Sequence, residues 1–206
     1  MTEPFVTRGF AGRPRAPGDV QGRIPPGQHQ VKDFPVLSAG PTPKIDLTTW
    51  ELAVTGLVGA PAKWSWTELL ALPAEDFVKD ISCVTTWTKL DMRWRGVSLD
   101  ALFEQVELDP RARALVAESY GGYTTNLLLT DALNGQAFIA YEYDGKPLAP
   151  DHGGPARLVV PHLYFWKSAK WIRGLRLVAE DRPGFWESNG YHIRGDPWKE
   201  ERYSGD

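Results

Sequence analysis

Residues 137–161 read AFIAYEYDGKPLAPDHGGPARLVVP, and this stretch decides the expected fold. Ala137 to Tyr143 is a short apolar and aromatic run that predicts a strand, and the Asp144-Gly145 pair after it is a strong signal for a tight turn. Arg157 to Pro161 predicts a second strand, which follows a Gly-Gly-Pro turn. The stretch therefore predicts two strands that are joined by turns and loops.

Outside this stretch, further short strands alternate with short helices. Ser65-Trp66-Thr67-Glu68 has the spacing of a capping box and predicts a helix that stops at Pro73. Ser98 can cap a second short helix that runs to Val106. Strands that are interrupted by short helices, without a steady βαβ alternation, indicate an α+β domain. The other expected strands are residues 50–58, 77–84, 115–118 and 171–178.

The chain divides into three regions by composition. Residues 1–44 are rich in Gly, Pro and Arg and form an irregular arm, which cannot build a core and must be disordered or packed on the body. Residues 45–180 hold the expected strands and helices and form the main domain. Residues 181–206 are polar, aromatic and rich in Gly and Pro, which predicts a loop-rich cover.

The overall composition is typical of a globular domain. With 42% hydrophobic residues, 24% charged residues and a net charge of −3, the chain has no global attraction to nucleic acid or to an anionic membrane. The first 27 residues lack the apolar run of a signal peptide, and Pro14 separates Arg13 from Arg15, so a cytoplasmic location is expected by default. Nine tryptophans predict either a large core or a Trp-lined cavity for a flat ligand.

Cys83 is the only cysteine of the chain. A single cysteine excludes an internal disulfide and a zinc or iron–sulfur site built from several cysteines. A lone cysteine in an apolar strand is most often a small core residue, and a nucleophilic cysteine would need a nearby base that its neighbours do not supply. A thiolate bound to a metal needs no such base, because the metal itself deprotonates the thiol.

A cluster of donors surrounds the Gly-Gly-Pro turn. Such a density of cationic and hydroxyl groups suits an anion that is held by an Arg fork, Lys charges and backbone N–H groups. A solvated basic edge is the alternative, and neither a Walker nor a Rossmann glycine motif is present. The donors are His152, Arg157, Lys167, Ser168 and Lys170.

These motifs, in their order and spacing, resemble the sulfite-oxidase superfamily of molybdopterin-dependent oxidoreductases. The resemblance covers residues 28–180 and implies a sulfite-oxidase-type molybdopterin-binding fold with mixed sheets, short helices and long loops. Residues 161–171 and the tail are particularly similar to the short, heme-free bacterial branch, which is like the catalytic subunit of the methionine-sulfoxide reductase system. The motifs are Cys83 after a strand and the stretches 140–148, 151–157 and 167–171.

The resemblance implies a role for each matching position. Cys83 would be the catalytic residue and the protein's thiolate ligand to molybdenum, for which soft sulfur is suited. Electrons would come from a separate flavin or heme protein. The implied contacts to the molybdopterin cofactor are Cys83, His29, Lys32, Asp33, Ser119, His152, Arg157, Lys167, Ser168, Ala169 and Lys170.

The chain departs from true sulfite oxidases after the cysteine, where that family has a Gly-Asn-Arg-Arg pattern. Here Val84-Thr85-Thr86-Trp87-Thr88 follows, without the arginines that help to hold an oxyanion. We therefore expect oxygen-atom transfer that reduces a neutral S-oxide or N-oxide. The alternatives are sulfite-type oxidation, a non-catalytic relative that only binds the cofactor, and a cysteine hydrolase that uses Cys83 with His152 or His162.

Overall fold

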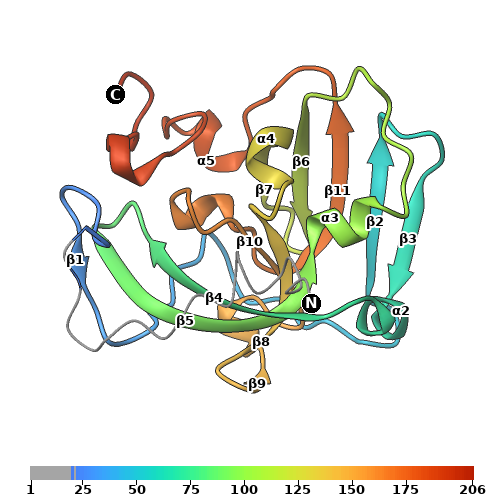
Figure 1. Cartoon of the computed structure of the whole chain (residues 1–206), viewed down its shortest axis with the longest axis horizontal. Helices are drawn as coiled ribbons and strands as arrows, with labels where there is room; N and C mark the ends of the chain where they lie inside the picture. The colour runs from blue at the N-terminus through green and yellow to red at the C-terminus, as the bar shows by residue number, and fades with distance from the viewer. Residues whose placement is uncertain (1–19, 21) are drawn as a thin grey trace, which may run out of the picture.

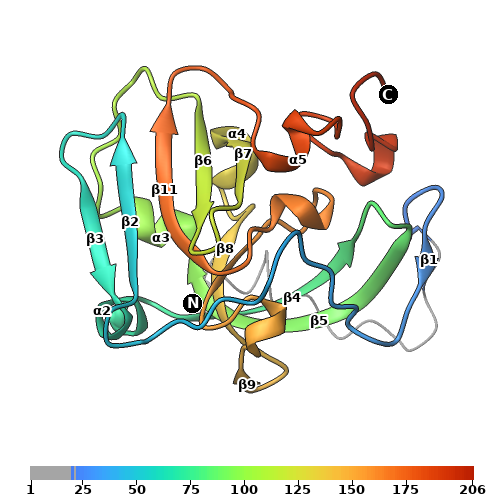
Figure 2. The same cartoon turned by 180° about the vertical axis from the view of Figure 1, so that it is seen from behind.

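The expected α+β class is confirmed: two mixed sheets are joined by long loops and a few short helices (Figures 1 and 2). The structure, a computed structural model, describes residue 20 and residues 22–206. The first part of the expected arm, including Arg13-Pro14-Arg15, lies outside the described residues. No helix in the described part of the chain is long and apolar enough to cross a membrane.

The first sheet has six strands in the order β1-β5-β8-β10, with β4 paired to β5 and β9 paired to β8. β1 runs parallel to β5, and the other pairs of this sheet are antiparallel. Its strands are β1 (His29–Gln30), β4 (Glu75–Ser82), β5 (Trp87–Ser98), β8 (Phe138–Tyr143), β9 (Lys146–Pro147) and β10 (Arg157–Val159).

The second sheet has five strands in the order β3-β2-β11-β6-β7, and β2 and β11 form its one parallel pair. Its strands are β2 (Glu51–Gly56), β3 (Ala62–Ser65), β6 (Ala114–Ser119), β7 (Thr124–Leu128) and β11 (Ile172–Val178). The α-helices among the described residues are α2 (Trp66–Ala71), α3 (Leu99–Phe103), α4 (Leu129–Ala132) and α5 (Phe185–Ser188), and the 3-10 helices there are η1 (Pro150–His152), η2 (Phe165–Lys167) and η3 (Pro197–Lys199).

Both predicted helix caps are confirmed. The Ser65 hydroxyl accepts a hydrogen bond from the Glu68 N–H at 3.3 Å, and the Glu68 carboxylate accepts one from the Ser65 N–H at 2.8 Å, which completes the capping box of α2. The Ser98 hydroxyl accepts from the Ala101 N–H at 3.2 Å at the start of α3. α3 ends at Phe103 rather than at Val106, because the chain continues in a turn.

Five strands were missed by the sequence prediction: β1, β3, β5, β7 and β9. β5, with 12 residues, is the longest strand in the part of the chain that the structure describes, and its charged residues weaken the strand pattern. Met92 and Trp94 are buried in alternation with the exposed Arg93, so the period of two is present but weak. Pairing with β4 on one side and β8 on the other stabilises this strand, and such pairing is not visible in a local window.

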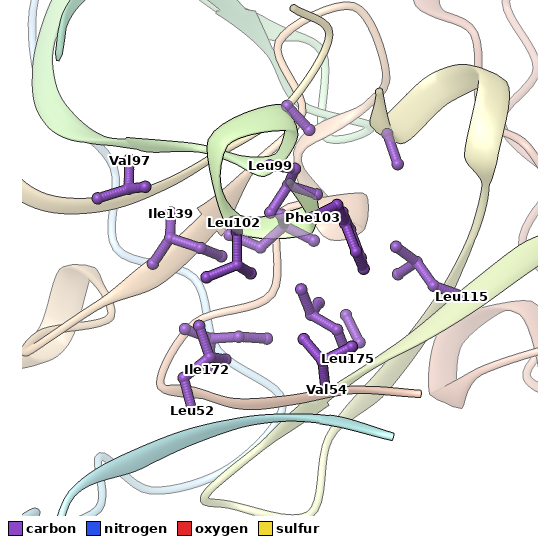
Figure 3. Packing of buried hydrophobic residues seen from close by; sticks show 14 of the residues in the cluster. Leu52, Val54, Val97, Leu99, Leu102, Phe103, Leu115, Ile139, Ile172 and Leu175 are labelled. Atoms are coloured by element: carbon purple, nitrogen blue, oxygen red, sulfur yellow. The ribbon is translucent and has the colours of Figure 1, made fainter. Parts of the chain in front are cut away.

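The main core lies between the two sheets, with α3 packed into it. Figure 3 shows Leu99, Leu102 and Phe103 of α3 facing residues of both sheets, among them Val54 and Ile139. These side chains are at most 6% exposed, so the core joins the sheets into one unit.

A second buried cluster lies at the far side of the six-stranded sheet. The rings of Phe77 in β4 and Phe138 in β8 stack at 3.9 Å, and Trp94 belongs to the same cluster. Cys83 packs against this cluster at the end of β4, so the cluster supports the position of the cysteine.

The described part of the arm is attached to the six-stranded sheet. The Arg23 guanidinium makes ion pairs with Asp80 and Asp91, each at 2.6 Å, and β1 pairs with the start of β5. Figure 2 shows the chain after β1 crossing the molecule past the connection between β10 and β11 on its way to β2. The arm thereby reaches the region where the predicted site residues lie.

Gly96 in β5 offers a test of this packing. A side chain at this position would collide with the Ile139 carbonyl oxygen and lie 2.9 Å from the Ala140 Cα. We expect Gly96→Ala to lower the free energy of unfolding by about 1–3 kcal/mol, as overpacking does. Urea unfolding should show a lower midpoint, whereas Gly40→Ala, where nothing lies within 4 Å, should leave it unchanged. Equal midpoints for both variants would contradict the tight approach of β5 and β8.

Candidate functional site

Cys83 begins the short turn that joins β4 to β5. The Thr86 N–H donates to the Cys83 carbonyl at 3.0 Å, and the Cys83 N–H donates to the Trp87 carbonyl at 2.9 Å. Thr86 has a φ of 73°, the left-handed conformation that closes a three-residue hairpin loop. The His29 N–H of β1 donates to the Thr86 carbonyl at 2.8 Å. Backbone hydrogen bonds therefore fix the cysteine on both sides.

The Cys83 sulfur is nearly enclosed. The residue is 7% exposed, and the Thr85 hydroxyl donates to its Sγ at 3.3 Å. Burial raises the pKa of the Cys83 thiol, and no imidazole among residues 20 and 22–206 hydrogen-bonds the sulfur. His162 instead pairs with Asp131 at 3.0 Å, so the geometry gives no support to a cysteine hydrolase.

The Cys83 sulfur faces a cavity of about 530 Å³. This volume is in the range of small-molecule and cofactor sites. Segments far apart in sequence meet around it: the arm, the turn after β4, the loop between β6 and β7, the η2 region and α5. The lining residues include Phe34, Pro35, residues 37–41, Cys83, Val84, Thr85, Trp87, Tyr123, Arg157, Phe165, Trp166, Ser168, Lys170, Trp171, Phe185, Trp186 and Tyr191.

Arg157 is a buried cation in the wall of this cavity. Its side chain donates to the carbonyls of His152 and Ser168, each at 2.7 Å, and its guanidinium lies 4.1 Å from the centroid of the Phe165 ring. No carboxylate in the described part of the chain pairs with it, and burial lowers the pKa of Arg157 to about 9. A buried charge without a counter-ion is costly, so this position favours an anionic ligand.

Ser168 and Lys170 lie beside Arg157 in the lining, as the sequence motif suggested. The Ser168 hydroxyl accepts from the Val160 N–H at 2.9 Å, and the Lys170 ammonium donates to the Asp151 carbonyl at 2.6 Å. Burial, and next the charge of Arg157, lower the pKa of Lys170 to about 8. Two cations and a hydroxyl therefore gather on one side of the cavity.

Several buried polar atoms near the cavity have no hydrogen-bond partner within the described chain. They are Nε1 of Trp87, which lines the cavity, Nδ1 of His152 and Oγ of Ser119. The His152 ring stacks on Phe34 at 3.8 Å, and burial lowers its pKa, which favours the neutral imidazole. Buried polar groups without a partner are rare and indicate a missing partner such as a ligand.

The remaining predicted site residues lie elsewhere. His29, Lys32 and Asp33 are exposed and do not line the cavity, although Phe34 and Pro35 directly after them do. Ala169 is buried in the main core, and the side chain of Lys167 enters a separate buried network. The structure thus brings together Cys83, Arg157, Ser168 and Lys170 in the cavity lining. His152 and Ser119 lie near the cavity but do not line it.

The sequence reasoning missed most of the aromatic lining. The nine tryptophans were the available signal, and both of their readings apply. Trp50, Trp64 and Trp94 are buried in the two hydrophobic clusters. Trp87, Trp166, Trp171 and Trp186 line the cavity. Without the fold, nothing in the sequence separates these two groups.

These features fit a metal–pterin cofactor. The cavity offers a soft sulfur ligand, a buried unpaired guanidinium and an unpaired indole N–H, and it is large enough for a ligand of that size. A divalent site made only of protein ligands does not fit, because the residues that the structure describes include no group of three His, Cys, Asp or Glu side chains that could hold a metal ion. The donors suit a metal that arrives with other ligands attached.

Comparisons with known proteins agree with this chemistry. The chain matches the family described as "Oxidoreductase molybdopterin binding domain" over residues 39–186. It is 46% identical over 189 residues to the uncharacterized oxidoreductase YuiH of Bacillus subtilis. The aligned region covers 91% of this chain and 96% of that protein.

Two other relatives carry names that describe a reaction. The chain is 30% identical to the putative protein-methionine-sulfoxide reductase subunit YedZ1 of Azospira oryzae, over 74% of this chain and 58% of that protein. It is 27% identical to a sulfite oxidase of Arabidopsis thaliana, over 75% of this chain and 48% of that protein. The chain thus spans about half the length of these two relatives.

Among solved structures, the chain resembles the sulfane dehydrogenase SoxCD from Paracoccus pantotrophus. The TM-score is 0.62 at 22% identity, over 68% of this chain and 41% of that one, and this likeness confirms the expected sulfite-oxidase-type fold. The family match covers most of the chain and includes Cys83, Arg157 and Lys170. The chain therefore belongs to the family of oxidoreductase molybdopterin-binding domains, and it is an oxidoreductase that uses molybdenum held by molybdopterin.

Proposed function

We propose that the chain catalyses oxygen-atom transfer and reduces a neutral S-oxide or N-oxide with electrons from a separate donor protein. In this reaction the bond from sulfur or nitrogen to oxygen breaks, the sulfur or nitrogen gains two electrons that the donor protein supplies, and the released oxygen takes up two protons from solvent and leaves as water. When bound, the molybdenum cofactor supplies the two-electron redox change. The protein binds the cofactor, shapes the substrate space and keeps bulk water out.

The cofactor would be held by residues of one side of the cavity. Cys83 would supply the thiolate ligand to molybdenum, and the Thr85 hydroxyl, 3.3 Å from Sγ, would keep donating to that sulfur. Arg157 and Lys170 would bind the pterin and its phosphate, because phosphate is recognised by an Arg fork and by ammonium groups. The unpaired Trp87 Nε1 would find a partner on the same ligand.

The observation that supports a neutral substrate is the uncharged lining of the cavity next to Cys83. Val84, Thr85 and Trp87 are apolar or hydroxylic, and none of Lys89, Arg93 and Arg95 belongs to the lining. A compact dianion such as sulfite would need fixed positive charges to offset its desolvation. A neutral oxide needs only its polar oxygen to reach the metal, while its carbon body contacts the aromatic side chains.

Sulfite oxidation is the second candidate, and a specific observation favours it. Arg157 and Lys170 line the same cavity as Cys83, so two cations are present there although Lys89, Arg93 and Arg95 do not line it. Both already donate to backbone carbonyls, and the cofactor phosphate would compete for them. We therefore give the neutral oxide preference.

Steady-state assays of the molybdenum-loaded protein decide between these reactions. We expect kcat/KM for a sulfoxide with an artificial electron donor to exceed kcat/KM for sulfite with an artificial acceptor. The reason is the charge balance near Cys83, where a dianion finds few free cations. The same assays on metal-free protein provide the control. Efficient sulfite oxidation would overturn the proposal.

The electron donor is proposed to be a flavin or heme protein in the same compartment, which we predict to be the cytoplasm. The name of the YedZ1 relative describes it as a subunit of a reductase, which supports a reaction that is shared between proteins. A transient donor would need only a small contact surface.

A further inference from the structure

A fully buried ion pair connects the η2 segment to the C-terminal cover. Nζ of Lys167 lies 2.6 Å from Oε1 of Glu187, and the two side chains are 1% and 0% exposed. The ammonium also donates to the Asn126 side chain at 2.7 Å and to the Ile193 carbonyl at 2.6 Å. The lysine thereby ties together η2, β7 and the segment after α5.

Glu187 also orients a residue of the cavity wall. Its Oε1 accepts from Nε1 of Trp166 at 2.9 Å and from the Thr125 hydroxyl at 2.8 Å, in addition to Lys167. Charge-assisted hydrogen bonds of this kind are stronger than neutral ones and fix geometry. The carboxylate therefore sets the orientation of the Trp166 indole.

Three aromatic residues in contact with one another form one side of the cavity, and we call Trp166, Trp186 and Tyr191 the aromatic wall. Trp186 and Tyr191 stack at 4.9 Å with 16° between their planes, and Trp166 meets Tyr191 edge-on at 4.9 Å. Glu187 follows Trp186 in α5, so the residue whose carboxylate accepts from the Trp166 indole is joined through the backbone to Trp186.

α5 cannot hold this arrangement by itself. The helix is four residues long, and a helix this short is unstable without tertiary contacts. Figure 1 shows α5 beside β7, the strand that carries Thr125 and Asn126, and the buried contacts join these two elements. The position of the aromatic wall thus depends on the ion pair.

We propose that Lys167 and Glu187 are positioning residues for the aromatic wall, and that this wall selects oxide substrates with a flat apolar body. The substrate part of this inference rests on the proposed function. Flat apolar groups gain from contact with aromatic faces, whereas a compact oxide reaches fewer of them. Lys167 does not line the cavity, so its role here differs from that of Arg157, which faces the cavity and would hold the cofactor.

Glu187→Ala removes the carboxylate, and we expect it to change selectivity rather than cofactor content. In the holoenzyme, kcat/KM for methyl phenyl sulfoxide should fall about tenfold relative to dimethyl sulfoxide, mainly through KM, because a lost apolar contact weakens binding by factors of this order. Molybdenum per protein should equal that of the wild type. Glu180→Ala, which changes an exposed carboxylate after β11, is the matched control and should change neither quantity.

Glu187→Gln keeps the shape of the side chain and an acceptor for Trp166, so it tests the pair if the alanine variant does not fold. We expect a smaller shift in the same direction. An equal loss of kcat/KM for both sulfoxides, no change in selectivity, or a loss of molybdenum would overturn the proposal.

A second readout separates this proposal from the proposed function. Acrylamide quenching of tryptophan emission in the holoenzyme should rise in both Glu187 variants, because a loosened wall exposes Trp166 and Trp186. If the wild type reduces no sulfoxide, the proposed function fails, and unchanged quenching would independently overturn the positioning role.

Discussion

Replacement of Cys83 by serine is expected to abolish turnover while the fold and most of the pterin binding persist. Serine has nearly the same shape, so the turn after β4 and its backbone hydrogen bonds should form as before. A hydroxyl is a poor substitute for a soft thiolate on a thiolate-rich metal centre. On the proposed function, Arg157 and Lys170 of the cavity lining would hold the rest of the cofactor, and the substitution does not change them.

Three measurements on the same preparation check this expectation: turnover, molybdenum and pterin content, and thermal unfolding. Ser82→Ala is the matched control, because Ser82 precedes the cysteine and its buried hydroxyl bonds to Thr88 at 2.9 Å without lining the cavity. That control should lose about 0.5–1.5 kcal/mol of stability for one hydrogen bond and keep its turnover. Wild-type activity in Cys83→Ser would remove Cys83 from the role of metal ligand.

The parts of the fold that depend on local signals could be predicted from the sequence. The capping box at Ser65 and the cap at Ser98 act through hydrogen bonds within four residues, so a short window contains them. The strand before Cys83 carries the apolar residues Phe77, Val78 and Ile81, and the strand that begins at Arg157 continues with Leu158 and Val159. β5 was missed because its charged side chains face solvent and its stability comes from pairing with β1, β4 and β8.

The candidate site shows the same division. Cys83, Arg157, Ser168 and Lys170 were named from motifs and line one cavity. Lys167 stands next to Ser168 in sequence, but the side chains point to different regions, and its partner Glu187 lies 20 residues further along the chain. Spacing alone cannot distinguish a lysine that faces a ligand from one that faces a buried carboxylate.

Arg157→Ala is the second variant with a large expected effect, and its signature is loss of the cofactor. The guanidinium is 1% exposed and has no carboxylate partner in the part of the chain that the structure describes, so an anionic ligand is the counter-ion that the site lacks. A charge-assisted contact of this kind is worth roughly 1.5–3 kcal/mol, or about ten- to a hundredfold in affinity. Molybdenum per purified protein should fall accordingly.

The stability of the cofactor-free protein separates this reading from general damage. In the absence of an anion, the buried charge of Arg157 is itself unfavourable, as its pKa of about 9 indicates. Removing this charge therefore offsets part of the stability that is lost with the packing of the side chain. We expect the difference in the free energy of unfolding between Arg157→Ala and wild type to be smaller in the cofactor-free proteins than in the loaded ones. Arg176→Ala, which breaks an exposed pair with Glu118 at 2.9 Å, controls for the loss of an arginine and should keep its molybdenum. Unchanged molybdenum content in Arg157→Ala would show that Arg157 and the Gly-Gly-Pro turn have a structural role and do not bind the cofactor.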